Sequence, residues 1–239
     1  MPRGVLTVLT DKDKQWLLQT HPLLIPKSAD VAGNIRLRAA YDRGSNRFVL
    51  LSEGDDGPHG ALVLDINFNI RIAERTKEAA SALPALHIEG VVPTPSRHFN
   101  QADHSACLCS PFEEREFLVP SFSFKRYLEE LVIPFLYGQK YYSLHDRWPW
   151  REYSHGVTGL LQSYARCSDQ IDIQQCLAIL RAQKDWPRIR SALQQRSFIK
   201  GVMTCFCSAR RQIRVCHPDA WHGIELLRRK VRALRIKLR

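Results

Sequence analysis

Two groups of thiol, imidazole and amide side chains in this sequence could carry out chemistry. The first group lies in the segment RHFNQADHSACLCSP and consists of His98, Asn100, Asp103, His104, Cys107 and Cys109. The second group lies in the segment TCFCSARRQIRVCHPD and consists of Cys205, Cys207, Cys216 and His217. A cysteine thiolate is both a nucleophile and a soft metal ligand, so each group admits a catalytic or a metal-binding interpretation.

Spacing alone leaves three interpretations of the first group open. Cys107 and Cys109 can be small buried apolar residues, because cysteine is among the most buried residue types. The pattern H-x5-H-x2-C-x-C, which begins at His98, supplies four donors for a metal ion at an unfamiliar spacing. Alternatively, one cysteine is a nucleophile near the amide of Asn100, which can stabilise an oxyanion, and near a histidine that lowers the thiol pKa.

The residues around the first group resemble those of ubiquitin-conjugating enzymes. The tripeptide HFN at 98–100, followed by Cys107 and a leucine, is similar to the HPN tripeptide and the downstream cysteine-leucine pair of that family. The flanking segments LPALHIEGVVPTP and WPWREYSHGVTGLLQSYA resemble stand-alone bacterial relatives encoded in antiphage defence operons of the CBASS type. The likeness extends in order over residues 11–166.

The resemblance implies transthioesterification. Cys107 would accept the activated C-terminal glycine of another protein as a thioester and pass it to an amine or a thiol, with His98 and Asn100 beside it. Cys107 is preferred to Cys109 because a leucine follows it, as in the family's pair. The chain departs from the family at Phe99, which replaces proline, and Cys107 follows Asn100 by seven residues, one fewer than in eukaryotic relatives, so the loop must differ.

The same resemblance implies the partners. The favoured partner is the C-terminus of the cGAS-like nucleotidyltransferase of a CBASS operon, and the alternative is an operon-encoded ubiquitin-like protein. No adenylation signature such as G-x-G-x-x-G occurs in the sequence, so activation of the carboxylate would need a separate enzyme or an unusual shortcut.

The second group has the spacing of a metal site. The pattern C-x-C-x8-C-H that begins at Cys205 offers four soft or imidazole donors within thirteen residues, and structural zinc sites bind four such ligands as a tetrahedron. It resembles the zinc motif at the C-terminus of SecA-like proteins, with Ser208 and Ala209 in place of the usual glycines. We therefore expect a structural zinc with no open catalytic position.

Positive charge concentrates near the C-terminus. The chain carries a net charge of +11, and residues 205–239 hold ten Lys or Arg against two acidic residues, which gives +8 there and +3 elsewhere. A basic amphipathic helix is expected in WHGIELLRRKVRALRIKLR, with an apolar face of Ile224, Leu227, Val231, Leu234 and Leu238. This tail could contact nucleic acid, but we rank that partner below a protein because the rest of the chain is nearly neutral.

The elements that must position these groups follow an α+β pattern. Strands are expected at 34–42, in the run RFVLL and at 60–74, where apolar residues alternate. Helices are expected at 11–21, from SFKRYLEEL onward, in GVTGLLQSYARC, from near Asp172 and in WPRIRSALQQRSFI. Pro134 is expected to kink or end the second of these helices. Residues 81–112, rich in proline, are expected to form a loop layer with a short strand in LHIEGVV.

These elements predict three parts of the chain. By the resemblance described above, residues 1–168 would form a ubiquitin-conjugating-enzyme-like domain, an antiparallel sheet flanked by helices. Residues 169–200 would be a helical linker, and residues 201–239 the zinc motif with its basic helix. No apolar run approaches the ~20 residues that span a bilayer, and the first residues lack a leader's apolar core. With seven cysteines, an odd number, these features predict a cytoplasmic protein without a disulfide framework.

Two other classes of function stay open on the sequence alone. The chain could be a non-catalytic zinc-binding module for nucleic acid or protein, with residues 98–109 forming a second metal site. It could also be a conjugating-enzyme fold that has lost activity and acts as a scaffold.

Overall fold

The computed structural model describes most of the chain and divides it into two compact units. The described residues are 9–27, 30–45, 47–52, 54–75, 81, 83–150, 152–197, 202–209 and 211–238. One unit, the sheet unit, comprises Met1–Cys109 and Glu116–Arg151, and the other, the helical unit, comprises Ser110–Arg115 and Glu152–Arg239. The sequence placed the first boundary at 168, whereas the units divide at 151, because α5 (Gly156–Cys167) packs against α9 (Pro218–Ala233).

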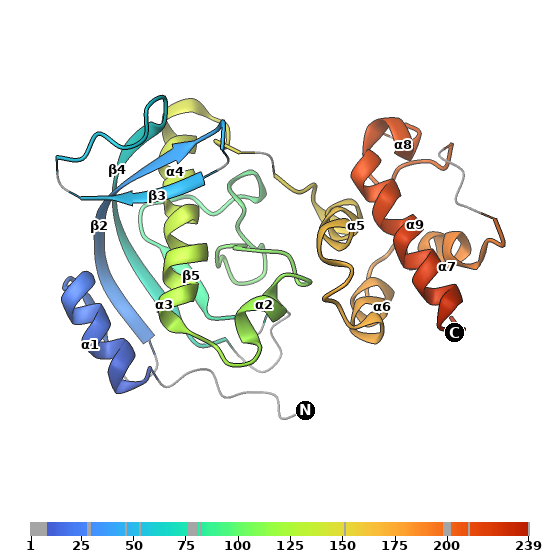
Figure 1. The fold of residues 1–239 in the computed structure, drawn as a ribbon, viewed down its shortest axis with the longest axis horizontal. Coiled ribbons are helices and arrows are strands. Elements are labelled where there is room, and N and C mark those ends of the chain that lie inside the picture. The colour runs from blue at the N-terminus through green and yellow to red at the C-terminus, as the bar shows by residue number, and fades with distance from the viewer. Residues whose placement is uncertain are drawn as a thin grey trace. The chain divides into compact units, whose positions relative to one another are not determined.

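The sheet unit contains an antiparallel sheet and helices (Figure 1). Its strands are β1 (Leu24–Pro26), β2 (Asp30–Asp42), β3 (Arg47–Leu51), β4 (Leu62–Ala73) and β5 (Ala85–Ile88). Its helical segments are α1 (Asp11–Thr20), η1 (Pro95–Arg97), α3 (Phe124–Tyr127), η2 (Leu128–Val132) and α4 (Ile133–His145), with α2 (Glu114–Leu118) at the return from the 110–115 segment. The α+β class predicted from the sequence is confirmed.

The long strand β2 organises the sheet, whose order is β1-β2-β4-β5. Along one edge β2 pairs first with β1 and then with β3, with Gly33 opposite Leu24 and Tyr41 opposite Phe48. Along the other edge it pairs with β4 over nearly its full length. The alternation predicted at 60–74 is confirmed, since the inward residues of β4 are buried; they are Leu64, Ile66, Ile70 and Ile72.

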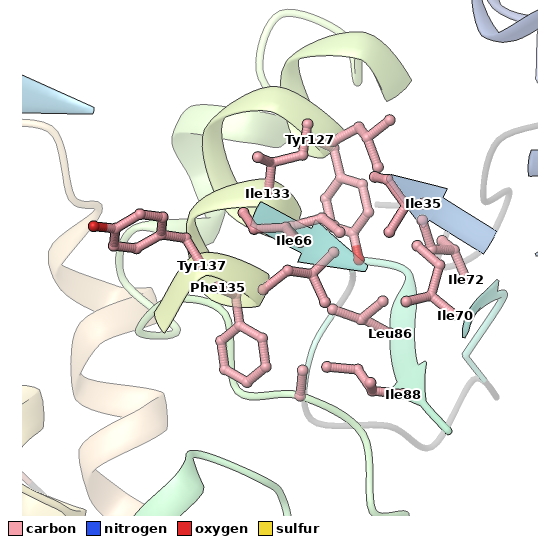
Figure 2. Packing of buried hydrophobic residues seen from close by; sticks show 14 of the residues in the cluster. Ile35, Ile66, Ile70, Ile72, Leu86, Ile88, Tyr127, Ile133, Phe135 and Tyr137 are labelled. Carbon is pink, nitrogen blue, oxygen red and sulfur yellow. The ribbon is translucent and has the colours of Figure 1, made fainter. Parts of the chain in front are cut away.

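One face of the sheet and the helical run from α3 to α4 form the core of this unit. Figure 2 shows isoleucine and leucine side chains of β2, β4 and β5 around Tyr127 and Ile133. Tyr127 is fully buried, and its hydroxyl donates a hydrogen bond to the carbonyl of Pro84 at 3.0 Å. Tyr137 donates in the same way to the carbonyl of Leu62 at 2.7 Å. Each hydroxyl group thus donates its hydrogen bond to a backbone carbonyl oxygen at the start of a strand.

Of the two outcomes expected at Pro134, a kink or an end of the helix, the helix does not end there. The chain stays helical from 124 to 145, and the five residues of η2 just before Pro134 form a π-helical turn. Proline has no N–H to donate, and its ring crowds the carbonyl four residues earlier. The wider π turn precedes the first turn of α4, where a proline is tolerated, so the helix passes this position.

The helical unit contains α5, α6 (Ile173–Arg181), α7 (Trp186–Gln194), α8 (Ile213–Cys216) and α9. The helix predicted near Asp172 is confirmed, with Asp172 accepting hydrogen bonds from the first backbone N–H groups of α6. The last residues of the predicted helix in WPRIRSALQQRSFI lie beyond the end of α7, and positions 198–200 lie outside the described residues. No helix in the described part of the chain is long and apolar enough to cross a membrane.

The C-terminal helix is shorter than predicted. Ile224, Leu227 and Val231 are buried as expected, but α9 ends before Leu234, which is exposed. Leu238 is buried from a position beyond the helix. The apolar pattern continues past the point where the helical backbone stops, so the periodicity alone overestimated the length of α9.

A buried ion pair on α9 also departs from the sequence pattern, which placed the arginines on the solvent side. Arg228 and Glu225 are 7% and 6% exposed, and their charged groups lie 2.5 Å apart. Arg229 reaches the same carboxylate at 3.4 Å from a more exposed position. Two guanidinium groups therefore compensate one buried carboxylate, as a buried charge requires.

The close approach of α5 and α9 generates a first prediction. A Cβ added to Gly223 would lie 1.9 Å from the carbonyl oxygen of Leu161, so Gly223→Ala must push the helices apart. We expect the helical unit to lose about 1–3 kcal/mol, although alanine would gain about 1 kcal/mol in an unobstructed helix. Urea unfolding monitored by circular dichroism measures the change. His222→Ala, at an exposed neighbouring position, should change stability by less than about 0.5 kcal/mol, and a stabilised Gly223→Ala protein would contradict the packing.

Candidate active site and metal centre

Residues 98–107, which we call the cysteine loop, close on themselves through backbone pairing. Phe99 and Ala106 form an antiparallel bridge, and the N–H of Cys107 donates to the carbonyl of His98 at 2.7 Å. The N–H of Ala106 donates to the carbonyl of Leu86 at 2.8 Å and so attaches the loop to β5. These backbone hydrogen bonds therefore fix both ends of the loop, one to the other and to β5, at the position of Cys107.

Phe99, which stands where the resembling family has proline, holds the loop by burial. Its side chain is 5% exposed and meets Phe135 of α4 edge to face, with ring centroids 5.7 Å apart. Burying an aromatic ring stabilises by roughly 1.5–3 kcal/mol, so this residue fixes the loop through the core. A packed aromatic side chain thus holds the backbone of the loop at this position.

A polar network fixes the middle of the loop. The side-chain amide of Asn100 donates to the hydroxyl of Ser105 at 3.0 Å. One carboxylate oxygen of Asp103 accepts from the N–H and the hydroxyl of Ser105 at 3.0 and 2.7 Å. The other oxygen lies 2.6 Å from the guanidinium of Arg75, which also donates to the carbonyl of Leu83. Arg75 is nearly buried, so this network joins the loop to the end of β4.

The network sets the charge state of Asp103. Partial burial raises the pKa of its carboxyl group, but the hydrogen bonds from Ser105 and the charge of Arg75 outweigh burial and lower the pKa below its ordinary value of 3.8. The carboxylate is therefore ionised at neutral pH and serves as an acceptor in the loop rather than as a base.

The start of the loop lies against an aromatic side chain. His98 adopts a left-handed backbone conformation with φ 55°, and its ring meets that of Trp148 at a centroid distance of 4.8 Å. The indole of Trp148 donates to the carbonyl of Ser96 at 3.1 Å, and buried Gln139 donates to the carbonyl of Arg97 at 2.7 Å. The residues of η1 are thus held from α4 and from Trp148, and His98, which directly follows η1, belongs to this packing.

The two loop cysteines differ in exposure. All seven cysteines lie in the described residues and none is in a disulfide, and Cys107 is the one that is exposed. Leu108 and Cys109 instead pack partly buried against the core. Thiol reagents in solution therefore reach the sulfur of Cys107 more readily than that of Cys109.

The interpretation of this segment as a second metal site is not supported. All four potential ligands of the H-x5-H-x2-C-x-C pattern are described, yet their ligand atoms do not gather within range of one ion. His98 packs on Trp148, whereas His104 is exposed at a left-handed position with φ 56°. The chain turns between these residues in a way that the spacing did not reveal.

Directly after Cys109 the chain enters the helical unit through the segment Ser110–Arg115. Phe112 is 3% exposed and contacts the ring of Tyr164 on α5, with centroids 6.0 Å apart. The hydroxyl of Tyr153 donates to the carboxylate of Glu113 at 2.6 Å. The segment that follows Cys109 is therefore fixed within the helical unit.

The second group of residues forms a compact set of metal-ligating atoms. Cys205, Cys207, Cys216 and His217 place one ligand atom each within 4.8 Å of the others. The sulfur of Cys205 lies 3.2 Å from Nδ1 of His217, and the sulfurs of Cys207 and Cys216 lie 3.4 Å apart. A tetrahedral ion with metal–sulfur bonds of about 2.3 Å requires separations of about 3.8 Å, so the donors fit a metal ion.

Local backbone structure explains this gathering. Thr204 and Gln212 form an antiparallel bridge, and α8 and the start of α9 then supply the last two ligands. The hydrogen bond with Cys207 raises the pKa of the Cys216 thiol to about 11, because it stabilises the protonated form of that thiol. A metal ion would displace such protons, which couples metal binding to pH.

Several residues that support the two sites were not singled out from the sequence. Arg75, Ser105 and Gln139 hold the cysteine loop, and Arg188 of α7 donates to the carbonyl of Thr204 beside the metal ligands at 2.8 Å. Their partners lie far away in the chain or are backbone oxygens. The spacing of residues in the sequence therefore does not reveal that these side chains support the two sites.

Comparison with protein-family models, curated proteins and solved structures finds no match to this chain.

The Asp103 network generates a second prediction. Ser105→Ala removes one donor from the Asp103 carboxylate, so we expect the pKa of Asp103 to rise toward 3.8. Because the pKa is lowered on folding, Asp103 contributes stability above 3.8 that is lost as the pH falls through the lowered value. In the variant this contribution should be smaller, and its loss should be complete at a higher pH. NMR titration of the carboxyl carbon measures the shift.

A matched control exists in a distant turn, where Ser45 donates to Asp42. Ser45→Ala should raise the pKa of Asp42 and leave Asp103 unchanged. An unaltered Asp103 titration in Ser105→Ala would show that Ser105 does not set its charge.

Proposed function

We propose that this chain is a cysteine-dependent conjugating enzyme that carries the C-terminal glycine of a protein as a thioester on Cys107. The observation that carries the proposal is the exposure of this thiol on a loop fixed at both ends. Cys109, its rival, packs against the core. A nucleophile that must meet a protein tail needs both accessibility and a defined position.

The architecture of the sheet unit supports a ubiquitin-conjugating-enzyme-like fold. In chain order it has the N-terminal helix α1, the antiparallel path β1-β2-β4-β5, the cysteine loop and the helix α4 packed on β4. This is the order that the resemblance in the sequence implies. The additional strand β3 pairs outside that path, on the free edge of β2.

The proposed reaction has two steps at Cys107. In the first, the thiolate attacks the activated glycine carbonyl, a carbon–sulfur bond forms, and the group that activated the carboxylate leaves with its electron pair. In the second, an acceptor amine attacks the thioester, a carbon–nitrogen bond forms, and the carbon–sulfur bond breaks to restore the thiolate. The proton of the amine passes to a base or to water.

The loop residues have different parts in this proposal. Asp103 is held by Ser105 and Arg75 and has a lowered pKa, so it positions the loop. His104 is exposed in the same loop and is the better candidate to accept the proton of the amine. Asn100 uses its amide within the loop, which supports a positioning role.

The setting that we propose follows the resemblance. The transferred protein is the cGAS-like nucleotidyltransferase of a bacterial antiphage operon, or alternatively a ubiquitin-like protein from its own operon. A separate activating enzyme supplies the activated carboxylate. The cytoplasm, where thiols stay reduced, is the compartment that suits this chemistry.

We assign zinc to the group of Cys205, Cys207, Cys216 and His217, in a structural role. Three sulfurs and one imidazole are a preferred zinc set, and four protein ligands leave no open position. In this position an ion would join the bridge at Thr204 to the start of α9. The ligands Cys207 and Cys216 would bind as thiolates.

The nucleophile can be tested with variants of both loop cysteines. Incubating the full chain with the candidate tail protein and its activating enzyme should give a covalent adduct that thiol reagents release, seen by non-reducing intact-mass analysis. Cys107→Ala should abolish the adduct, because no other cysteine is as exposed, and Cys109→Ala should retain it. An adduct that persists in Cys107→Ala would reject the assignment of the nucleophile.

Metal binding can be tested separately. The metal-free protein should take up one equivalent of Co²⁺ with thiolate-to-metal charge-transfer absorption, and zinc should displace it. Cys205→Ala should weaken the affinity by about 100-fold or more, because it removes a buried ligand. His222→Ala changes an exposed histidine close by on α9 and should bind as the unaltered protein does. Equal Co²⁺ uptake by all three proteins would rule out the site.

A further inference from the structure

The two units divide the charge of the chain very unevenly. The helical unit holds 18 Lys or Arg against 8 Asp or Glu, whereas the sheet unit holds 17 against 16. The net charge is thus +10 in the helical unit and +1 in the sheet unit. The basic character that the sequence showed as a C-terminal tail belongs to a whole folded unit.

The acidic residues of the helical unit are largely engaged inside it. Glu225 is buried with Arg228 and Arg229. Asp185 pairs with a guanidinium on the same helix at 3.1 Å, and Asp172 caps α6. These carboxylates therefore offset little of the positive electrostatic potential that the exposed arginines create at the surface.

The exposed cations lie on elements that pack together. Arg232 and Arg228 of α9 donate to the backbone carbonyls of Arg196 and Gln195, just after α7. Arg188 of α7 donates to the backbone beside the metal ligands. These contacts join α7, the metal-ligand group and α9 into one continuous region. Besides Arg188, its exposed cations, which we call the basic surface, are Arg190, Arg196, Arg211, Arg214, Arg229, Arg232, Arg235 and Lys237.

The composition of the basic surface favours phosphate. All but one of its residues are arginine, whose planar guanidinium binds phosphate oxygens in a bidentate manner. Insertion of an amphipathic helix into a membrane surface uses an apolar helix face, and the apolar face of α9 is buried against α5. The phosphates of a nucleic acid are regularly spaced, so they can contact cations on several adjacent elements at once. Most protein surfaces carry mixed charges and match such a set of cations less well.

We propose that the helical unit binds the phosphate backbone of nucleic acid through the basic surface. The sequence alone ranked nucleic acid below a protein partner because it showed a basic appendix on a nearly neutral chain. The fold spreads that charge over α7, the metal-ligand group and α9. Binding of this kind is strongly salt-dependent and reads little base sequence. It does not depend on the thioester chemistry proposed for the sheet unit.

The test measures the affinity of the full chain for fluorescein-labelled single-stranded RNA and duplex DNA. Fluorescence anisotropy reports binding at salt concentrations between about 50 and 200 mM. The triple variant Arg190→Glu, Arg214→Glu, Lys237→Glu changes one exposed residue on each part of the basic surface. The matched control, Lys12→Glu, Arg47→Glu, Arg147→Glu, makes the same change in net charge with exposed residues of the sheet unit.

We expect the plot of log affinity against log salt to lose about 2 to 3 units of slope in the first triple variant, with at least about tenfold weaker binding at 100 mM salt. The control should retain the slope and bind within about twofold of the unaltered protein. Equal losses in both variants, or no salt-dependent binding at all, would overturn the proposal. Binding to anionic phosphatidylglycerol vesicles or to an acidic polypeptide, in the absence of binding to RNA and DNA, would also overturn it.

Discussion

The packing of the helical run from α3 to α4 on one face of the antiparallel sheet is the interaction on which the sheet unit depends. It buries Tyr127 completely, and the same helix then supplies Phe135 to the cysteine loop and Gln139 to the turn before it. Gly138 leaves room for Trp148, since a Cβ there would lie 2.1 Å from the indole ring. The helix that forms the core therefore also positions the candidate site, and stability and geometry are linked through one element.

A reactive thiol that meets protein substrates has to satisfy two opposed requirements, exposure and a fixed position. The cysteine loop meets both because the fixing is done by its neighbours. Phe99 enters the core, Ser105 and Asp103 bond to each other and to Arg75, and the sulfur of Cys107 stays outside. Rigidity here comes from residues that have no chemical part in the proposed transfer.

The helical unit differs in how it places its charged residues, because acidic and basic side chains occupy different positions in it. Acidic residues are used in caps and buried pairs such as Glu225 with Arg228, and most arginines remain outside. The group of Cys205, Cys207, Cys216 and His217 brings four potential metal ligands together between α7 and α9. The segment Ser110–Arg115 belongs to the same unit although it directly follows Cys109, so the backbone joins the candidate active site to the unit that holds the metal ligands.

The sequence by itself determined the α+β class, the alternation of β4, the position of α6 and the four ligands that the structure brings together near the C-terminus. These features depend on local periodicity or on ligands within thirteen residues, where the chain between them is too short to separate them far. Only the tertiary structure decided that Cys107 is exposed and Cys109 packed, that Arg75 reaches Asp103, that Arg228 is buried, and that α5 joins the helical unit. Each of these results from contacts between segments distant in sequence, and such contacts follow from the total burial of the fold, which no local pattern of residues specifies.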